Sequence, residues 1–303
     1  MDRLLRREVS GFARDHASGA IEITLRAIKA VRSWLRRTRA WETSQLATVA
    51  AALLRAQPSM APLLRLANEI SLSVDASDPA IHLSRILRAF ERRIRASPDQ
   101  IAHHLKRWLR NKKRPQVFTY SYSSTVVHAL GQARRYVDGV SCSESRPGNE
   151  GIKTARALAA KGIETFYHTD AGLFSQLWGN EVLLLGADAV LAGWVAAKAG
   201  TKVLVARALQ LGSPVVFLVD TSKFWREPSA RSRRWDWTFG PDEDLWKNPP
   251  RRVEIYNLYF ELIPISARSR VRFLTEFGWM SARRVRIAIN RIHISPRLES
   301  FAD

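Results

Sequence analysis

The stretch VFTYSYSSTVVHAL, residues 117–130, changes from a strand-like to a helix-like pattern, and this change indicates the fold class of the chain. It begins with the β-branched and aromatic residues of a buried strand, and it ends as an apolar segment with helical character. Small hydroxyl residues and tyrosines lie between these two parts. The stretch therefore predicts a strand that enters a polar turn and continues into a helix.

The same order of strand and helix recurs along the following hundred residues. Helical segments are predicted at 151–162 and 193–210, and strands at 116–120, 137–142, 164–168, 181–186 and 214–220. Strands that alternate with helices form right-handed crossovers and an open parallel sheet. A further strand-like segment at 253–264 and a helical segment at 266–278 are expected in the tail.

The first part of the chain has a different rhythm. Apolar residues recur at three- and four-residue spacing between positions 21 and 35, with Arg and Lys between them, which predicts helices. Asp78 before Pro79 predicts a helix N-cap, and Ser97 before Pro98 predicts a second helix start. The charged connector at 110–115 marks a boundary. The predicted fold is α/β, with a helical domain over 1–113 and a Rossmann-like domain with an open parallel sheet over 114–303.

Polar or glycine-rich sequence lies at the end of each of the five predicted strands, at 120–123, 143–151, 169–172, 186–188 and Asp220. Ligands of open α/β sheets bind beyond the carboxyl ends of the strands. The pattern therefore predicts a ligand site at this edge of the sheet. Loops are polar in any case, and this explains part of the pattern.

The composition favours anionic partners. The formal net charge is +20, from 48 Lys and Arg against 28 Asp and Glu. Phosphorylated small molecules, RNA and acidic protein surfaces are all attracted by a strongly positive protein. The alternative is that most of these charges are simply solvated and bind no partner. No apolar run approaches the roughly 18 residues of a membrane span, so no membrane partner is predicted.

The single cysteine and the absence of common catalytic motifs exclude several classes of site. A single cysteine, Cys142, excludes an internal disulfide framework and a cysteine-based zinc site, and it indicates a reducing cytoplasm. The chain has no GxGxxG, GxxxxGK[ST], HExxH, GxSxG or CxxC pattern. No cofactor or metal is therefore predicted.

Three blocks carry a resemblance to a known family: SESRPGNEG (143–151), GADAVLAGWVAAKAGT (186–201) and NLYFELIP with LTEFG (257–264 and 274–278). In order and spacing they resemble the translation initiation factor 2B alpha/beta/delta family over residues 115–280. That family includes methylthioribose-1-phosphate isomerase and ribose-1,5-bisphosphate isomerase, as well as regulatory subunits. The resemblance implies a helical domain before a Rossmann-like domain, and pairing of subunits through the latter.

The catalytic block of the isomerases is altered in this chain. Where they have Thr-His-Cys, with a catalytic cysteine, this sequence has Thr119, Tyr120 and Ser121. Asp188, in an intact Gly-Ala-Asp block, matches their catalytic aspartate. A serine hydroxyl cannot exchange protons near neutral pH without a strong base beside it, and one carboxylate alone does not make an acid/base pair. Cys142 ends the neighbouring strand and could replace the thiol, but a small inert core residue is the more common role.

This sequence retains more of the ligand-binding residues of the family than of its catalytic residues. Arg146 could hold a phosphate in a bidentate manner, or pair with Glu144 or Asp170. Glu150 replaces a family glutamine, and Asp170 could instead be a helix N-cap. Lys198 could bind an anion or lie on a solvated helix face. By resemblance the predicted ligand-binding residues are Tyr120, Ser121, Arg146, Pro147, Gly151, Asp170, Lys198, Gly200 and Thr201.

The sequence thus favours a non-catalytic or regulatory family member, located in the cytoplasm, that binds a phosphorylated sugar or nucleoside monophosphate. A homodimer or a family hetero-oligomer is expected. One alternative is an aldose-1-phosphate to ketose-1-phosphate isomerase that uses Asp188 with an altered partner. A second is a basic protein that associates with RNA or the ribosome. Segment 222–246 interleaves Arg with Trp and Phe, which suits either stacking on nucleic acid or packing over the sheet and at a subunit contact.

Overall fold

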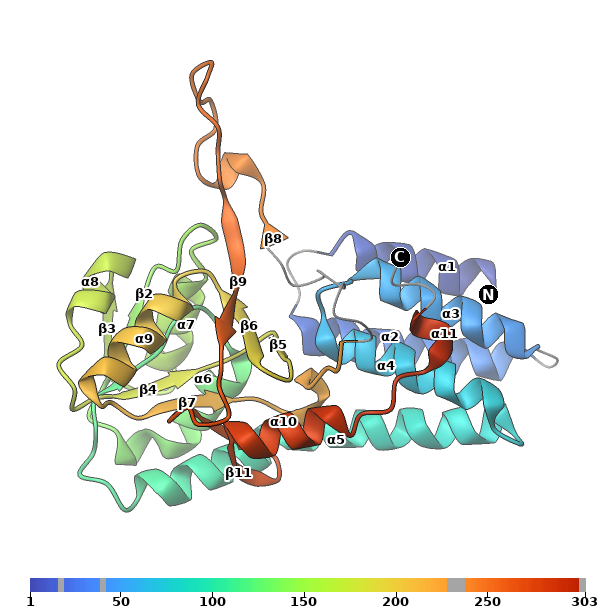
Figure 1. Cartoon of the computed structure of the whole chain (residues 1–303), viewed down its shortest axis with the longest axis horizontal. Coiled ribbons are helices and arrows are strands. Elements are labelled where there is room, and N and C mark those ends of the chain that lie inside the picture. The colour runs from blue at the N-terminus through green and yellow to red at the C-terminus, as the bar shows by residue number, and fades with distance from the viewer. Residues whose placement is uncertain (16–18, 39–41, 228–237, 300–303) are drawn as a thin grey trace.

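The computed structural model describes residues 1–15, 19–38, 42–227 and 238–299 (Figure 1). Its first part is helical and consists of α1 (Arg3–Ala13), α2 (Ala20–Arg37), α3 (Thr43–Ala56), α4 (Ala61–Leu72) and α5 (Pro79–Leu109). A short 3₁₀ turn, η1 (Ser73–Asp75), connects α4 to α5. Their apolar faces share one core, which includes the fully buried Phe12, Ile28 and Trp34. None of the described helices is both long and apolar enough to cross a membrane.

Helix α5 confirms one predicted helix start and contradicts the other. The Asp78 side chain accepts a hydrogen bond from the backbone N–H of Ile81 at 3.0 Å, as an N-cap does. The start predicted at Ser97 and Pro98 is wrong, because α5 continues through both residues. The Ser97 hydroxyl donates to the carbonyl of Arg93 at 2.7 Å. Apolar residues on both sides of Pro98 remain buried on one face, so packing outweighs the backbone hydrogen bond that proline removes.

The main sheet has seven strands in the described chain, in the order β11-β10-β7-β4-β1-β2-β3. All five predicted strands are present and parallel, as β1 (Val117–Phe118), β2 (Val140–Ser143), β3 (Thr165–His168), β4 (Val182–Leu185) and β7 (Val215–Leu218). β10 (Arg272–Thr275) is parallel to β7, and β11 (Gly278–Ser281) is the antiparallel edge. The predicted α/β fold with a mostly parallel sheet is confirmed.

Helices connect and cover these strands. They are α6 (Ser124–Ala133), α7 (Glu150–Ala159), α8 (Asp170–Ser175), α9 (Thr201–Leu211) and α10 (Ala282–Asn290), with short 3₁₀ turns η2 (Arg134–Tyr136) and η3 (Thr221–Lys223). The second half of α5 packs on the sheet through Ile101 and Leu105. At the end of the chain, α11 (Pro296–Glu299) returns to the helical part, where Leu298 is buried among the N-terminal helices (Figure 1).

The helix predicted at 193–210 is wrong in its first part. Trp194–Lys198 forms strand β6, and the helix begins only at Thr201. β6 belongs to a second, four-stranded sheet in the described chain, with the order β5-β6-β9-β8, where β5 is Ala189–Val190, β8 is Thr238–Phe239 and β9 is Leu258–Pro264. Five residues of β6 pair with β9. This long-range pairing overrides the helical preference of the alanine-rich segment.

The helix predicted at 266–278 is also wrong, because the segment forms β10 and enters β11. Phe273, Leu274 and Thr275 are buried in succession, because β10 lies inside the sheet between β7 and β11. Arg272 is exposed, whereas Val271 and Phe273 are buried on either side of it. A continuous buried run is typical of an internal strand covered on both faces, and pairing with β7 and β11 overrides the helical prediction.

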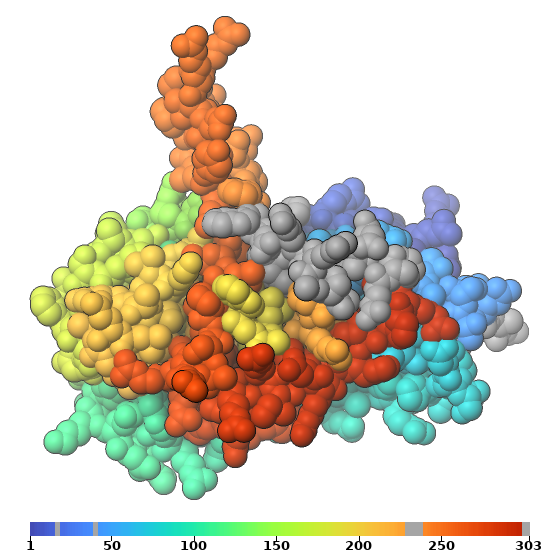
Figure 2. Space-filling model, in the orientation of Figure 1, coloured from blue at the N-terminus to red at the C-terminus, as the bar shows by residue number. Residues whose placement is uncertain are grey.

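An arm projects from the body of the molecule between β8 and β9, shown in orange (Figures 1 and 2). It includes residues 240–257 and the 3₁₀ turn η4 (Asp242–Asp244). Trp246 and Tyr256 are exposed on it. The Arg- and Trp-rich segment 222–246 thus contributes one side of the arm, and its residues 228–237 lie outside the described part of the chain.

Candidate functional site

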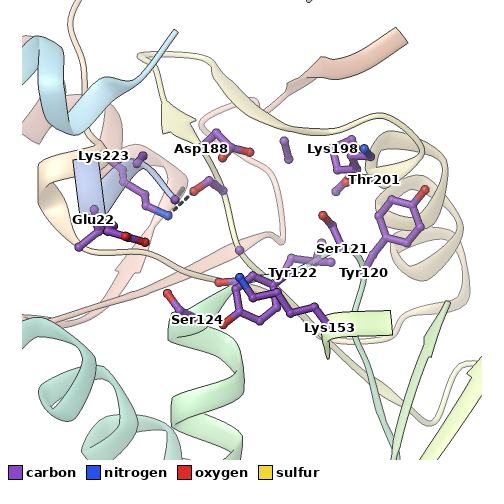
Figure 3. A pocket seen from close by; sticks show the side chains of 18 of the residues that line it. Glu22, Tyr120, Ser121, Tyr122, Ser124, Lys153, Asp188, Lys198, Thr201 and Lys223 are labelled. Atoms are coloured by element: carbon purple, nitrogen blue, oxygen red, sulfur yellow. Dashed lines mark hydrogen bonds between the residues drawn. The ribbon is translucent and has the colours of Figure 1, made fainter. Parts of the chain in front are cut away.

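A cavity of about 360 Å³ lies at the carboxyl ends of β1 and β4. Its walls are the strand-end residues 120–124 and 185–188, and Ala197, Lys198 and Thr201. The beginning of α2, from Gly19 to Glu22 and at Leu25, closes it from the helical part, and Lys153 and Lys223 complete it (Figure 3). The cavity is therefore formed between the two parts of the chain.

Tyr120 is held on one side of this cavity. Its hydroxyl donates to the carbonyl of Ala199 at 2.9 Å, and its ring lies against Phe174 at 5.7 Å between centroids. Burial and the nearby Asp170 raise the pKa of Tyr120, so the phenol remains neutral. Gly200 has φ +99°, and a Cβ there would lie 2.6 Å from the tyrosine hydroxyl. Gly200 is thus needed for backbone geometry and for the position of Tyr120.

Ser121, at the position of the family cysteine, lies in a left-handed backbone conformation with φ 60°. Its N–H donates to the hydroxyl of Ser145 at 2.9 Å, and its carbonyl accepts a hydrogen bond from Thr154 at 2.8 Å. Ser145 has φ 60° as well. Non-glycine residues rarely adopt this conformation, and they often do so at functional sites. The two strand-end turns are thereby fixed to each other.

Asp188 lines the opposite wall of the cavity (Figure 3). Burial raises the pKa of Asp188, while the positive charges of Lys223 and Lys198 act in the opposite direction. Lys223 donates from Nζ to the carbonyl of Ala187 at 2.6 Å, which holds its ammonium beside the aspartate loop. A carboxyl next to a fixed cation can accept a hydrogen bond from a ligand hydroxyl.

Lys198 is buried on β6, so its predicted alternative role on a solvated helix face is wrong. Its ammonium lies 2.8 Å from the carboxylate of Glu150 and 3.7 Å from the centre of the Tyr259 ring. Burial lowers the pKa of Lys198, and Glu150 partly restores it. Burial and Glu150 raise the pKa of Tyr259 to about 12, which keeps the phenol neutral. Figure 3 shows the Lys198 amino group pointing away from the cavity centre.

Asp170 organises the turn after β2. Its carboxylate accepts from the hydroxyl of Ser143 at 2.6 Å and from the backbone N–H groups of Ser145 and Arg146, both at 2.8 Å. The alternative that Asp170 is a helix N-cap is wrong, because Thr169 caps α8 through its side chain. The guanidinium of Arg146 donates to the carbonyl of Asp244 in the arm at 3.3 Å, not to Glu144 or Asp170.

Gly151 lies at the start of α7, against the end of β2. A Cβ at this position would lie 1.5 Å from the carbonyl oxygen of Ser143, so no other residue fits without backbone movement. Pro147 is buried in the turn between β2 and α7. Both residues shape the turn that carries Arg146 and Glu150.

The structure brings together only some of the residues predicted from the sequence. Tyr120, Ser121, Asp188, Lys198 and Thr201 line the cavity, while Arg146, Pro147, Gly151, Asp170 and Gly200 lie outside its lining. Among the charged residues of the lining, sequence analysis missed Glu22, Lys153 and Lys223, whereas Tyr122 lies in the strand-end segment predicted to form the site. Lys223 follows Asp220 at the fifth strand end and could have been found there, whereas nothing in its local sequence marks Glu22.

Cys142 is buried on β2 and does not line the cavity. Burial raises the pKa of its thiol to about 11. At neutral pH such a thiol remains protonated and unreactive, as expected for a core residue.

The sequence matches the initiation factor 2 subunit family over residues 16–282. Two curated relatives are eIF-2B subunit 2-like proteins of Pyrococcus. The P. furiosus protein is 34% identical over 120 residues, covering 38% of this chain and 43% of the relative. The P. horikoshii protein is 32% identical over 153 residues, covering 49% and 52%. The alignments thus span about half the length of the curated relatives.

Solved structures share the fold over nearly the whole chain. Translation initiation factor eIF-2B of Pyrococcus horikoshii OT3 has a TM-score of 0.73 at 23% identity, covering 93% of this chain and 98% of that one. The subunit matched in the tetrameric eIF2B-beta2-delta2 complex of C. thermophilum has a TM-score of 0.69 at 18% identity, covering 94% and 93%. The 5-methylthioribose 1-phosphate isomerase of P. horikoshii OT3 has a TM-score of 0.65 at 14% identity, covering 98% and 87%.

Proposed function

Because the chain belongs to the initiation factor 2 subunit family, we propose that it is a non-catalytic or regulatory member. It binds a phosphorylated sugar or a nucleoside monophosphate in the cavity at the strand ends. The observation that carries this proposal is the chemistry of the cavity wall. The amino groups of Lys153 and Lys223 point into the cavity, among hydroxyl groups of Ser121, Tyr122 and Ser124 (Figure 3).

This arrangement suits a ligand with a phosphate at one end and hydroxyl groups at the other. Ammonium groups bind phosphate oxygens through charge-assisted hydrogen bonds. The carboxylates of Glu22 and Asp188 accept hydrogen bonds from sugar hydroxyls, and the serine and tyrosine hydroxyls donate or accept. A volume of about 360 Å³ is in the range of small-molecule sites.

The cavity residues support binding better than the isomerase reaction of the family. Among the described residues of the lining there is no histidine and no cysteine, so the carboxyls of Asp188 and Glu22 are its acid/base groups beside hydroxyls and amines. Isomerisation of an opened sugar moves a proton between neighbouring carbons or shifts a hydride, and it needs a positioned acid/base pair. Ser121 offers a hydroxyl where related isomerases have a thiol.

The isomerase alternative rests on Asp188. Burial raises the pKa of this carboxyl, which brings it closer to the range in which it can both give and take a proton. In this alternative a lysine or a bound water takes the place of the missing thiol. It predicts turnover by the natural protein that depends on Asp188.

The oligomeric state is part of the proposal. The family resemblance favours a dimer formed through the Rossmann-like domain, taken as residues 114–303, or a hetero-oligomer with related subunits. The shared fold with a subunit of the tetrameric eIF2B-beta2-delta2 complex supports an oligomer of this kind. We place the protein in the cytoplasm, where its sugar-phosphate or nucleotide ligands would be found.

Ligand binding is tested by thermal shift and calorimetry with ribose-1,5-bisphosphate, methylthioribose-1-phosphate and AMP. At least one should raise the melting temperature of the natural protein, because a ligand bound only to the folded state stabilises it. The shift should disappear in the double variant Lys153→Ala/Lys223→Ala. It should persist in Lys29→Ala/Lys161→Ala, which removes the same charge from exposed positions elsewhere.

Turnover of the two sugar phosphates by the natural protein, Ser121→Cys and Asp188→Asn separates the two functions. The non-catalytic proposal expects no turnover by the natural protein. Turnover that is lost in Asp188→Asn would establish the isomerase alternative. Absence of any ligand shift, with all three compounds at millimolar concentration, would overturn the binding proposal.

A further inference from the structure

A second surface with a distinct composition shares no residue with the strand-end cavity and lies where the last two turns of α5 run beside the edge strand β11. We call residues 103–114 and 277–279 the α5–β11 surface. The ring of Trp108 lies 5.2 Å from that of Trp279, and the ring of His104 lies beside Gly278. Figure 1 shows α5 and β11 along the same lower edge of the molecule.

This surface combines aromatic rings with unopposed positive charge. Phe277, in the turn between β10 and β11, is 73% exposed. The Lys112 ammonium lies 4.7 Å above the Trp108 ring. The α5–β11 surface contains six Lys and Arg residues and no Asp or Glu, and α10, which directly follows β11, adds three arginines and no acidic residue. All nine cations are exposed: Lys106, Arg107, Arg110, Lys112, Lys113, Arg114, Arg283, Arg284 and Arg286.

The carboxylates nearest in sequence are already engaged. Glu276 is buried and accepts hydrogen bonds from Thr221, and Asp99 pairs with His128. Within the described residues, Arg114 is the one member of the nine with an ion pair, at 4.0 Å from Asp138. The other eight cations of this group therefore have no carboxylate partner in the described chain.

We propose that the α5–β11 surface binds single-stranded RNA, with bases stacked on exposed aromatic rings and phosphates held by the cations of α5. Proteins that bind single strands combine a positive track with rings on which bases stack. Phe277 offers an open ring, and the half-buried Trp108 and Trp279 form a second platform. A base on Trp108 would displace the Lys112 ammonium from that ring and free it for a phosphate.

The rings favour RNA over an acidic protein, because every base presents a flat face that stacks on an exposed ring. They also favour single strands over a duplex, because bases in a duplex are stacked on one another and cannot reach a protein ring. This inference is independent of the ligand proposed for the strand-end cavity, since the two sites share no residue.

The test is fluorescence anisotropy with a labelled twelve-nucleotide oligouridine between 50 and 200 mM salt, about the range over which phosphate contacts show their salt dependence. The double variant Arg107→Ala/Arg110→Ala should weaken binding at least about tenfold and flatten the salt dependence, since each lost phosphate contact lowers the slope by about 0.7. Phe277→Ala should weaken binding by about five- to tenfold with an unchanged slope, as expected for one lost stacked base.

Arg85→Ala/Arg92→Ala is the matched control, because it removes two exposed arginines from the same helix outside the α5–β11 surface. It should leave binding within about twofold, on the order of the screening expected between charges more than a Debye length apart. Equal weakening by both double variants would overturn the inference in favour of a general field effect. Unchanged binding by Phe277→Ala, equal binding of duplex RNA, binding of polyglutamate in preference to RNA, or no RNA binding at 50 mM salt would each overturn it as well.

Discussion

The ammonium of Lys198, at the end of strand β6, and the carboxylate of Glu150, at the start of helix α7, form an ion pair with 2.8 Å between Nζ and Oε1. The lysine side chain is 3% exposed and the glutamate side chain 31%. Because the lysine has almost no access to water, its charge depends on Glu150, whereas Glu150 retains partial solvation. The pair is therefore asymmetric, and it stabilises the junction between β6 and α7.

We expect Glu150→Gln to cost about 3 kcal/mol of unfolding free energy at pH 7, because it leaves a buried cation without its partner. Lys198→Met should cost less, since the remaining glutamate is partly solvated, and the double variant should cost less than the sum of the two. Urea unfolding of the four proteins measures these differences. Equal losses in the two single variants would contradict the asymmetry.

The same pair predicts a pH dependence. The folded pKa of Lys198 lies below its unfolded value, because burial lowers it more than Glu150 raises it. The unfolded chain then binds more protons between the two values, so stability rises as pH increases through that window. Removal of the glutamate charge lowers the folded pKa further. The loss caused by Glu150→Gln should therefore shrink between pH 7 and pH 9, which the same unfolding curves would show.

Asp170→Ala should lower the unfolding free energy by about 3 kcal/mol, because it removes the acceptor for two backbone N–H groups and one hydroxyl. Loss of these bonds frees the turn that carries Ser145, and with it the contact between Ser145 and Ser121. Hydrogen exchange of the N–H groups of Ser145 and Arg146 should accelerate. Asp242→Ala, an exposed carboxylate on the arm, is the control and should leave both stability and exchange unchanged.

Gly151→Ala should be among the most damaging single-methyl changes in the protein. Its Cβ would lie 1.5 Å from the carbonyl oxygen of Ser143, so β2 and α7 would have to separate. We expect a loss above about 3 kcal/mol, in the range of severe overpacking. Gly11→Ala adds the same methyl inside α1 with nothing within 4 Å, and it should stabilise by about 0.5–1 kcal/mol. Thermal unfolding of both variants tests the contrast.

Cys142 should react very slowly with a disulfide reagent such as Ellman's reagent. A thiol with pKa about 11 is about 0.1% thiolate at pH 8, compared with roughly a quarter for an unperturbed cysteine of pKa about 8.5. The native protein should therefore react at least about 100-fold more slowly than the protein unfolded in guanidinium chloride. Fast labelling in the native state would show an accessible thiolate and reopen a catalytic role for Cys142.

The local sequence pattern was sufficient to predict the parallel strands and the polar segments at their ends. Buried strands such as Val182–Leu185 are short apolar runs bounded by turn residues, and the Asp78 cap acts within four residues of its own position. These features depend on neighbours in sequence, which is why they could be predicted. Two of the predicted strand ends also converge on one place, since Tyr120 and Ser121 of the first and Asp188 of the fourth all line the cavity.

The remaining features depend on partners that are distant in sequence. The alanine-rich segment at Trp194–Lys198 is a strand because β9 pairs with it, and the serine and proline within α5 do not end that helix because its apolar face is buried on both sides of them. The cavity acquires Glu22 only because α2 packs over the strand ends. The sequence by itself determined the order of strands and helices, through local periodicity and turn chemistry. Tertiary structure decided which charges are buried and which residues meet, because burial and long-range pairing arise only when separate segments exclude water together.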